Sequence, residues 1–583
     1  MDDLISRAKR WFAQDPDEVT RTELAELVAR LEAGDESVRK DLESRFAGPL
    51  EFGTAGLRGV IGAGESRMNR AVVLRTALGL GRYLLSLDAA GARERGVVVG
   101  YDGRRLSREF SEDTCAVLAT LGIPTFLSDV VIPTPTTAYA VNHLGAIAGV
   151  MVTASHNPPE YNGYKVYWGN GAQIIPPHDT GIAAAIETAP PANEVPRLGL
   201  PEARKEGLAR DLPAEVTSAY LAGVRALSVR TGGERGAPIV YTPLHGVGDI
   251  LVHAAMSAAG FTHVTSVALQ AQPDGEFPTV AFPNPEEKGA LDLAYALADR
   301  EKADLILASD PDVDRLAVAL RNEGGKFVQL TGNQVGVLLG HDLLTHSTGQ
   351  DRCILASCVS SPELGGIAEA MGVHYEETLT GFKWIANRAL QLKDERNLRM
   401  TFGYEEALGY SVGELVRDKD GISAAVAMAE LWAGLRAEGR TLLDQLDAIA
   451  REYGLWVSGQ VAVTLPGKEG LDRIRGIMKS LRDDPPKKIG PLAVVGRSDA
   501  SIGKRWLGEV ESVLPLPPSD VLFYQLEGGS RIVARPSGTE PKIKLYVDVR
   551  EGVAEGEAIG IVRKRALDRL GELKAAVSAR VGV

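Results

Sequence analysis

Residues 97–104 read Val-Val-Val-Gly-Tyr-Asp-Gly-Arg, and this order of residue types recurs along most of the chain. Three β-branched residues are typical of a short buried strand, and a polar loop containing glycine follows them. A short buried-type strand followed by a polar or glycine-containing loop is found again at 239–248 and at 354–362, and helical patterns follow at 251–259 and 364–371. Strands that alternate with helices predict α/β domains with largely parallel sheets.

The two ends of the chain depart from this pattern. Residues 1–48 read as helical, because Thr20 and Glu23 have capping-box spacing and apolar residues follow at helical spacing. From residue 456 onward, β-type runs such as 457–465 and 543–549 predict an α+β domain with an antiparallel sheet. A chain of 583 residues is too long for one core. The predicted division is a helical extension and four domains: 1–48, 49–235, 236–330, 331–455 and 456–583.

The overall charge excludes one broad class of partner. The chain has 64 Lys and Arg against 77 Asp and Glu, which gives a formal net charge of −13. Such a surface repels the nucleic-acid backbone, so general nucleic-acid binding is not expected. A small anionic substrate stays possible, because a few Arg and Lys side chains can dominate a single cleft.

The cysteines and the hydropathy indicate a compartment. Cys115, Cys353 and Cys358 form no C-x-x-C pair, and their odd number makes a poor disulfide framework, which predicts reduced thiols. Residues 1–20 are charged throughout and lack the apolar core of a secretory signal. The longest nearly uncharged run, 144–154, is shorter than the ~20 residues that span a bilayer. We therefore expect a cytoplasmic, soluble protein that does not bind membranes.

The first chemical motif is Thr-Ala-Ser-His-Asn-Pro-Pro at 153–159. Its Asn and Pro residues predict a sharply turned loop after a strand. Ser155 on such a loop is a candidate nucleophile if a neighbour activates it, and His156 and Lys165 are close in sequence. Taken alone, the motif leaves open a serine in an ordinary Asx/Pro turn.

The second motif is Ser-Asp-Pro-Asp-Val-Asp-Arg at 309–315, directly after a strand-like run. Aspartates at alternate positions direct carboxylates to one side of an extended backbone, and three oxygen ligands suit Mg²⁺. A calcium EF-hand needs Gly at its sixth position and Glu at its twelfth, but Arg315 and Arg321 stand there. A solvated acidic turn is the remaining alternative.

The third motif is Arg-Pro-Ser-Gly-Thr-Glu-Pro-Lys-Ile-Lys at 535–544. Backbone N–H groups of a glycine-containing turn bind anions, and an Arg side chain adds a bidentate fork. This combination predicts a phosphate-binding loop, with an exposed basic hairpin turn as the alternative.

Two glycine-bounded stretches complete the set. Adjacent carboxylates in Gly-Tyr-Glu-Glu-Ala-Leu-Gly, at 403–409, can accept hydrogen bonds from sugar hydroxyls, and 380–383 and 417–421 flank this motif. Phe-Gly-Thr-Ala-Gly-Leu-Arg-Gly, at 52–59, is glycine-rich but lacks the lysine of a P-loop. No P-loop pattern occurs in the chain, so ATP binding has no support.

In this order and at these spacings, the motifs resemble the α-D-phosphohexomutase superfamily of phosphoglucomutases and phosphomannomutases. The resemblance spans residues 50–550 and is most specific at 153–158, 310–315 and 535–546. The 52–59 and 403–409 motifs and the N-terminal extension are similar to the branch with the longer phosphoglucomutases and phosphopentomutases. The resemblance implies four domains around a central cleft, three related mixed α/β domains and a smaller C-terminal α+β domain.

The resemblance also implies a role for each candidate residue. Ser155 carries the phosphoryl group, and Mg²⁺ is held by an oxygen of the Ser155 phosphate together with Asp310, Asp312 and Asp314. The groups expected around the transferring phosphoryl group are Arg58, His156, Lys165 and Arg315. Those expected to face the sugar are Thr380, Gly381, Lys383, Glu405 and Lys419. Those expected to bind the other phosphate are Arg535, Ser537, Gly538, Thr539 and a lysine, Lys542 or Lys544.

The implied reaction converts α-D-glucose 1-phosphate into glucose 6-phosphate through phosphoserine and glucose 1,6-bisphosphate. This makes the chain an isomerase and intramolecular phosphotransferase of carbohydrate metabolism. A single serine needs a second phosphate site, because each end of the bisphosphate must face the serine in turn. Lys165 is preferred to His156 as the base, since cationic surroundings favour a neutral lysine.

The identity of the sugar stays open. Many members have a serine two residues after the first sugar-binding glutamate, where this chain has Ala407. Glucose phosphate leads, and a phosphopentomutase or phosphomannomutase with the same mechanism is the alternative. A sugar-bisphosphate synthase would need a separate phosphoryl donor. A catalytically silent sugar-phosphate-binding protein is a further alternative, but the intact Ser155 and aspartate triplet argue against it.

Overall fold

The computed structural model describes residues 3–53, 56–230, 232–465, 467–537 and 542–582. Its contacts divide the chain into two compact units, and each unit consists of two stretches of sequence. The first unit is Met1–Leu330 with Gly409–Glu430, and the second is Thr331–Leu408 with Leu431–Val583. Within the described ranges, no helix is both long enough and apolar enough to cross a membrane.

Helices occupy the N-terminal segment, as the sequence predicts: α1 (Asp3–Gln14), α2 (Glu18–Glu32) and α3 (Arg39–Arg45). The predicted capping box is wrong in position. Asp17 caps α2 by accepting a hydrogen bond from the backbone N–H of Val19, and an aspartate is as good an N-cap as threonine. Thr20 lies inside the helix, where its hydroxyl donates to Asp15 at 2.7 Å.

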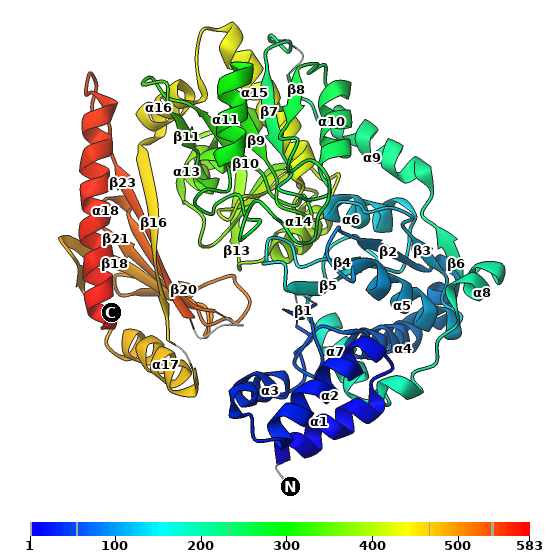
Figure 1. Ribbon diagram of the computed structural model, residues 1–583. Helices are drawn as coiled ribbons and strands as arrows, with labels where there is room; N and C mark the ends of the chain where they lie inside the picture. The colour runs from blue at the N-terminus through cyan, green and yellow to red at the C-terminus, as the bar shows by residue number, and fades with distance from the viewer. Residues whose placement is uncertain (1–2, 54–55, 231, 466, 538–541, 583) are drawn as a thin grey trace. The chain divides into compact units, whose positions relative to one another are not determined.

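The first sheet has the strand order β1-β5-β4-β2-β3-β6. Strands β4, β2, β3 and β6 run parallel, and β5 turns back antiparallel between β4 and β1. The strands are β1 (Leu57–Val60), β2 (Val97–Tyr101), β3 (Thr125–Leu127), β4 (Ala148–Val152), β5 (Tyr161–Trp168) and β6 (Ala209–Asp211). The helices are α4 (Arg70–Arg95), α5 (Ser107–Thr120), α6 (Thr134–His143), α7 (His178–Glu187), α8 (Leu200–Lys205) and α9 (Ala214–Ala226). Helix α4 packs against α5 and α7 (Figure 1).

The second sheet, also in the first unit, has the order β11-β10-β9-β7-β8. Strand β7 is parallel to β8 and β9, whereas β10 is antiparallel to β9 and β11. The strands are β7 (Ile239–Thr242), β8 (Val264–Ser266), β9 (Leu305–Ala308), β10 (Ala317–Arg321) and β11 (Phe327–Gln329). The helices here are α10 (Asp249–Ala258) and α11 (Asp292–Glu301), and the unit also holds β15 (Gly409–Val412) and the start of α15 (Gly421–Ala437).

The second unit begins with another α/β arrangement, in which β12 lies between β13 and β14 and is parallel to both. Its strands are β12 (Arg352–Ser357), β13 (His374–Thr378) and β14 (Arg399–Glu405). Its helices are α12 (Gly332–His346), α13 (Glu363–Ala370), α14 (Phe382–Arg396) and α16 (Leu442–Tyr453).

The rest of the second unit is an antiparallel sheet with the order β16-β23-β22-β21-β18-β19-β20, and β17 pairs with β18. The strands are β16 (Leu455–Thr464), β17 (Lys488–Ile489), β18 (Leu492–Asp499), β19 (Lys504–Leu507), β20 (Val510–Val513), β21 (Leu522–Leu526), β22 (Arg531–Pro536) and β23 (Lys542–Glu551). The helices are α17 (Gly467–Asp483) and α18 (Ile559–Val581), and α18 packs along β16 and β23 (Figure 1).

The fold class predicted from the sequence is confirmed, with three α/β sheets and a C-terminal antiparallel sheet. The β2 strand of the opening stretch is buried along its whole length in the middle of its sheet. Antiparallel strands at one edge make the first two sheets mixed, which residue types do not reveal. The domain boundaries stay a prediction.

Candidate active site

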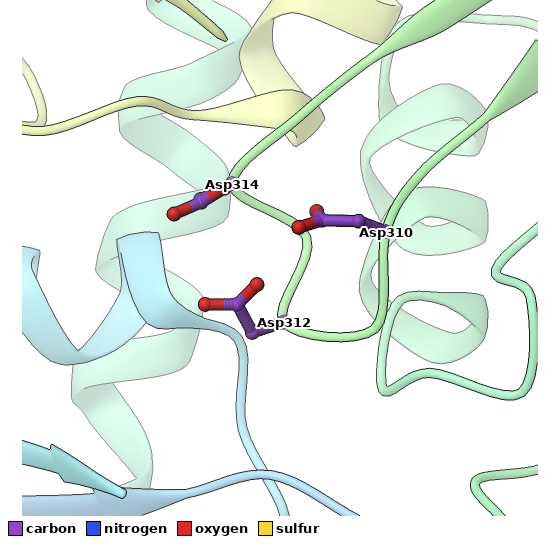
Figure 2. Close-up of side chains that lie close together, drawn as sticks. All are labelled: Asp310, Asp312 and Asp314. Atoms are coloured by element: carbon purple, nitrogen blue, oxygen red, sulfur yellow. The ribbon is translucent and has the colours of Figure 1, made fainter. Parts of the chain in front are cut away.

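The three aspartates lie on the loop between β9 and β10 (Figure 2). Asp310, Asp312 and Asp314 are at most 1% exposed, and one ligand oxygen from each lies within 4.8 Å of the others. Alternate positions on a turning backbone thus bring the carboxylates together, as the sequence predicts.

Neighbouring backbone fixes the shape of this loop. The N–H of Val313 donates to the carbonyl of Asp310 at 3.0 Å, and the N–H of Val247 donates to Pro311 at 2.9 Å. The loop after β7 packs so closely that a Cβ on Gly246 would lie 2.3 Å from Pro311 Cα. Only glycine fits there, so the β7 loop supports the aspartate loop directly.

The pKa values of the three carboxyl groups shift in different directions. Burial, together with repulsion from Asp312 and Asp314, raises the pKa of Asp310 well above its usual value. Burial also acts to raise the pKa of Asp314, but Lys165, Lys419 and Arg315 outweigh it and lower that pKa. Burial and Asp314 act to raise the pKa of Asp312, but Lys165 and a hydrogen bond from Thr134 lower it overall.

The cluster fits a hard divalent cation. Among the described residues, no donor hydrogen-bonds to Asp312 Oδ1 or Asp314 Oδ1, although both oxygens are buried. Buried carboxylate oxygens without a donor are costly unless a cation satisfies them. An all-oxygen ligand set of this kind is the chemistry that Mg²⁺ prefers.

Ser155 contacts this cluster from the loop between β4 and β5. Its hydroxyl donates to Asp310 Oδ2 at 2.7 Å, and the residue is 3% exposed. Its φ angle of 51° is in the left-handed region, and Thr153 Oγ1 accepts its N–H at 2.8 Å. A left-handed φ is uncommon for serine and is typical of residues that their surroundings hold in place.

His156 contacts the serine oxygen, and Arg315 contacts His156. Nδ1 of His156 lies 3.1 Å from Ser155 Oγ, and Nη2 of Arg315 lies 3.5 Å from His156 Nε2. Burial lowers the pKa of His156 well below 6.5, and Arg315 and Arg58 lower it further. The imidazole is therefore neutral at neutral pH. Arg58 is exposed on β1 and donates to Asn157 Oδ1 at 3.1 Å.

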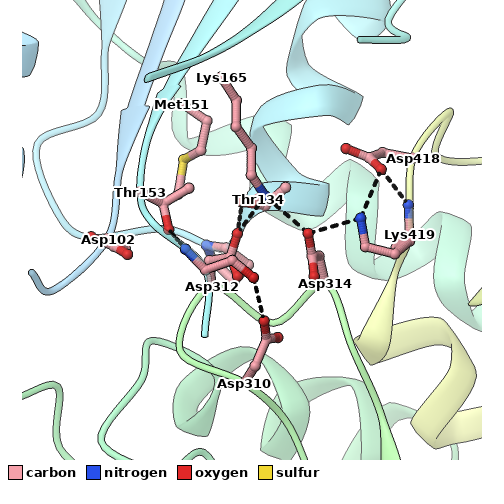
Figure 3. Close-up of polar contacts among 12 residues, drawn as sticks. Asp102, Thr134, Met151, Thr153, Lys165, Asp310, Asp312, Asp314, Asp418 and Lys419 are labelled. Atoms are coloured by element: carbon pink, nitrogen blue, oxygen red, sulfur yellow. Dashed lines mark hydrogen bonds and ion pairs between the residues drawn. The ribbon is translucent and has the colours of Figure 1, made fainter. Parts of the chain in front are cut away.

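Lys165, preferred as the base on the expectation of surrounding Mg²⁺ and Arg charges, contacts two carboxylates of the aspartate cluster, and its role as the base stays a prediction. Nζ of Lys165 lies 2.7 Å from Asp312 Oδ2 and 2.9 Å from Asp314 Oδ2 (Figure 3). Burial acts to lower the pKa of Lys165, but the two carboxylates outweigh it and raise the pKa. Lys419, predicted to face the sugar, lies on the same cluster, 3.0 Å from Asp314 Oδ2.

The second unit holds four of the five predicted sugar-facing residues, Thr380, Gly381, Lys383 and Glu405, whereas Lys419 belongs to the first unit. Gly381, with φ 111°, donates its N–H to Glu405 Oε1 at 2.7 Å, which brings the 380–383 and 403–409 motifs together. Thr380 Oγ1 is buried and has no hydrogen-bond partner among the described residues. Nζ of Lys383 lies 6.0 Å from the Trp384 ring centroid.

The predicted phosphate loop joins β22 and β23. Arg535 stands directly opposite Lys544 in the strand register, and the N–H of Ser537 donates to the carbonyl of Lys542 at 2.7 Å. Because side chains alternate along a strand, Lys542 shares the face of Lys544 and Arg535. Basic side chains on one face of a hairpin are the residue types that bind a phosphate, and their role as a phosphate site stays a prediction. Gly538 and Thr539 lie outside the described residues.

Three further residues at the site are absent from the sequence-based set. Thr134 Oγ1, at the start of α6, donates to Asp312 Oδ2 at 2.6 Å. Asp418 accepts from the Tyr167 hydroxyl at 2.7 Å, which ties the turn that carries Lys419 to β5. Arg104 contacts the backbone of the Ser155 loop. Arg104 ends the Gly-Tyr-Asp-Gly-Arg stretch that follows a predicted strand, which marks it as a loop residue. Its contacts with backbone carbonyls leave no pattern in the sequence.

Models of four successive domains of the phosphoglucomutase/phosphomannomutase family match the chain. The α/β/α domains I, II and III match residues 49–192, 218–325 and 331–453, and the C-terminal domain matches residues 461–559.

Relatives carry names that refer to three sugars. The Haemophilus influenzae protein named "Probable phosphomannomutase" is 42% identical over 487 residues, which are 83% of this chain and 93% of that protein. Mus musculus phosphopentomutase is 38% identical over 573 residues, covering 94% and 90% of the two chains. Staphylococcus epidermidis phosphoglucomutase is 37% identical over 505 residues, covering 86% and 90%.

Proposed function

The chain belongs to the phosphoglucomutase/phosphomannomutase family, and on that premise we propose that it interconverts α-D-glucose 1-phosphate and glucose 6-phosphate. Phosphoserine 155 is the phosphoryl carrier, and glucose 1,6-bisphosphate is the intermediate. The observation that carries the proposal is the 2.7 Å contact between Ser155 Oγ and the buried aspartate cluster.

Asp310, Asp312 and Asp314 would hold Mg²⁺ together with an oxygen of the Ser155 phosphate. When bound, the cation neutralises charge on the phosphoryl oxygens and on the carboxylates. Positively charged side chains of the protein also offset the negative charge of the carboxylates. Lys165 and Lys419 contact the aspartates, and Arg315 lies beside His156 with its Nε 3.9 Å from Asp310.

The proposed cycle starts from phosphoserine 155. The phosphate of the sugar 1-phosphate is held by the predicted phosphate loop, through Arg535, Ser537, Gly538, Thr539 and Lys542 or Lys544. The sugar is faced by Thr380, Gly381, Lys383 and Glu405. The free hydroxyl of the sugar attacks phosphorus, and the bond between phosphorus and Ser155 Oγ breaks. The resulting bisphosphate turns end for end, and transfer of its other phosphate to Ser155 releases the 6-phosphate. Phosphate and protons therefore balance over the cycle.

Proton transfer falls to His156 in this scheme. Its Nδ1 lies 3.1 Å from Ser155 Oγ, and a neutral imidazole can take the proton of the attacking hydroxyl and deliver it to the serine oxygen. Lys165 is less suited, because its ammonium group is paired with two carboxylates. Arg58 and Arg315 are proposed to stabilise charge on the equatorial oxygens of the transferring group.

A phosphopentomutase is the second candidate. The mouse phosphopentomutase covers almost the whole chain, and Ala407 removes a hydroxyl that many hexomutases place beside the sugar. A phosphomannomutase would use the same residues. The proposal also places the protein in the cytoplasm, on the basis of three buried free thiols, and gives it small phosphosugars as substrates.

A coupled assay distinguishes these candidates. Purified protein is supplied with Mg²⁺ and with glucose 1-phosphate, mannose 1-phosphate or ribose 1-phosphate, each with and without a catalytic amount of glucose 1,6-bisphosphate. We expect the highest kcat/KM on glucose 1-phosphate, and activation by the bisphosphate. A preference for ribose 1-phosphate would make the phosphopentomutase assignment correct, and equal rates on all three would refute glucose as the specific substrate.

A further inference from the structure

Arg104 binds four backbone carbonyls of the loop that carries Ser155. Its Nη1 donates to Pro158 at 2.8 Å and to Tyr161 at 3.1 Å, and its Nη2 donates to Ser155 at 2.6 Å and to Asn157. The side chain is 1% exposed, so these bonds form out of contact with solvent. Four of the five guanidinium N–H groups are thus used on one loop.

Asp102 orients this guanidinium. Its carboxylate lies 3.5 Å from Arg104 Nε and accepts the backbone N–H of Arg104 at 3.0 Å and the Ser107 hydroxyl at 2.8 Å. The N–H of Asp102 donates to Val152, the last residue of β4, at 3.1 Å. The turn after β2 therefore makes hydrogen bonds both to β4, the strand that precedes the serine loop, and to the serine loop itself.

The second sheet domain covers the other side of Arg104. The guanidinium carbon lies 4.9 Å from the ring centroid of Phe277, which is 2% exposed. The turn that carries Gly103 packs closely against the segment 273–277 of the second sheet domain. A Cβ on Gly103 would lie 2.8 Å from Pro273, and one on Gly275 would lie 2.9 Å from the carbonyl oxygen of Gly103.

The segment 273–277 contacts the loop after β7, and that loop in turn contacts the aspartate loop. The N–H of Asp274 donates to the carbonyl of His245, and the next residues after His245 are Gly246 and Val247, which contact Pro311. Arg104 therefore lies between the loop of the nucleophile and a segment that supports the metal-binding loop.

We propose that Arg104 is a positioning residue for phosphoryl transfer, which sets the position of Ser155 Oγ against the aspartate cluster through its four carbonyl contacts. The proposal rests on the proposed function. Arg104 itself makes hydrogen bonds to the carbonyls of the serine loop and an ion pair with Asp102, so its effect falls on the transfer step and not on substrate binding. A lysine keeps the charge but lacks the planar fork that reaches four acceptors.

The test compares Arg104→Lys and Arg104→Ala with the wild type and with Arg105→Ala. Arg105 is a matched control, because its side chain is 48% exposed and donates to a single carbonyl of the same loop, Pro159, at 3.2 Å. Three quantities are measured: kcat and KM with a phosphosugar, the rate at which glucose 1,6-bisphosphate phosphorylates Ser155 by mass spectrometry, and the midpoint of urea unfolding. Arg104→Ala is also assayed with millimolar methylguanidine.

We expect both Arg104 variants to lose about 100-fold in kcat and in the rate of Ser155 phosphorylation, because misplacing a reacting group by ~1 Å costs that much. KM should change by less than ~3-fold, since uniform substrate binding is unaffected. Methylguanidine should restore part of the lost rate in Arg104→Ala, which a general loss of folding would not allow. Arg105→Ala should behave like the wild type.

Wild-type rates of Ser155 phosphorylation in both Arg104 variants would overturn the inference. Equal losses in Arg105→Ala, or no rescue in a protein that still unfolds cooperatively, would do the same. If wild-type Ser155 accepts no phosphoryl group from any sugar bisphosphate, the proposed function fails and the inference falls with it. The two failures are therefore distinguishable.

Discussion

Ser155 Oγ donates a 2.7 Å hydrogen bond to Asp310 Oδ2, and this bond joins two loops that are 155 residues apart in the sequence. Ser155 follows β4 of the first sheet and Asp310 follows β9 of the second. Ligands of open α/β sheets bind at the carboxyl ends of strands. Here the ends of strands from two sheets meet, and a phosphate on Ser155 would lie against three carboxylates. The proposed cation would reduce the repulsion between that phosphate and the carboxylates.

Thr134 donates a hydrogen bond to Asp312, one of the three proposed cation ligands. Thr134→Val removes the 2.6 Å hydrogen bond and leaves a residue of similar size. We expect the Mg²⁺ concentration for half-maximal activity to rise about 10-fold, which is typical of a lost partner of a metal ligand. The measurement is mutase rate against Mg²⁺ after EDTA treatment. Thr137→Val is the control, because the Thr137 hydroxyl contacts Pro133 and Met151 and no carboxylate. An unchanged Mg²⁺ requirement in Thr134→Val would show that the hydroxyl does not support the ligand.

Glu406 predicts a pH dependence of stability. Burial, with Glu405 adding to it, raises the pKa of Glu406 from 4.5 to about 7. The folded state therefore binds this proton more tightly than the unfolded state. Its contribution is fully present below pH 4.5 and is lost as the pH rises through 7.

Glu406→Gln removes this titration and keeps an oxygen that can accept from Ser357 and Ser360. We expect its free energy of unfolding to exceed that of the wild type by about 1–3 kcal/mol at pH 8, and the two to converge near pH 4.5. Urea unfolding at four pH values between 5 and 8 measures the difference. A difference that stays constant with pH would mean that Glu406 is ionised in the folded protein at all of them.

Arg531 is a buried ionic link inside the second unit. It lies on β22 and pairs with Glu377 of β13 at 2.7 Å and with Asp548 of β23 at 3.1 Å. Arg531→Met leaves Asp548, 2% exposed, without its cation, and should cost about 3–5 kcal/mol in the free energy of unfolding. Lys479→Met, which breaks the exposed pair with Asp483, should cost less than ~1 kcal/mol. If urea unfolding shows the same loss of stability for Arg531→Met and Lys479→Met, the buried ion pairs of Arg531 contribute no more than an exposed ion pair.

The sequence predicts the parts of the site that depend on local order. The strand and turn residues around Ser155 and around Asp310 place each loop at a strand end, because neighbours in sequence determine both. The convergence of the two loops was implied by a family resemblance and by no local pattern. Alternating aspartates predict that three carboxylates gather at one point, which the structure confirms, and the binding of a cation there stays a prediction.

The sequence does not predict which charges become neighbours. Lys165 lies on β5 of the first sheet, and its ammonium group pairs with Asp312 and Asp314, which follow β9 of the second sheet, a pairing that no local pattern indicates. The sequence does not predict the contacts of Arg104, because its partners are backbone carbonyl oxygens, which every residue has. Asp17 rather than Thr20 caps α2, since two good N-cap residues stood within one turn.

The most direct test is the phosphorylation state of Ser155. The protein is incubated with Mg²⁺ and glucose 1,6-bisphosphate, digested, and examined by mass spectrometry, alongside Ser155→Ala. We predict a phosphate on the peptide that contains Ser155 and its removal on addition of excess glucose 6-phosphate. We also predict that Ser155→Ala lacks the phosphate and loses mutase activity. A phosphate on another residue, or a Ser155→Ala protein with full mutase activity, would contradict the role of Ser155 as the phosphoryl carrier.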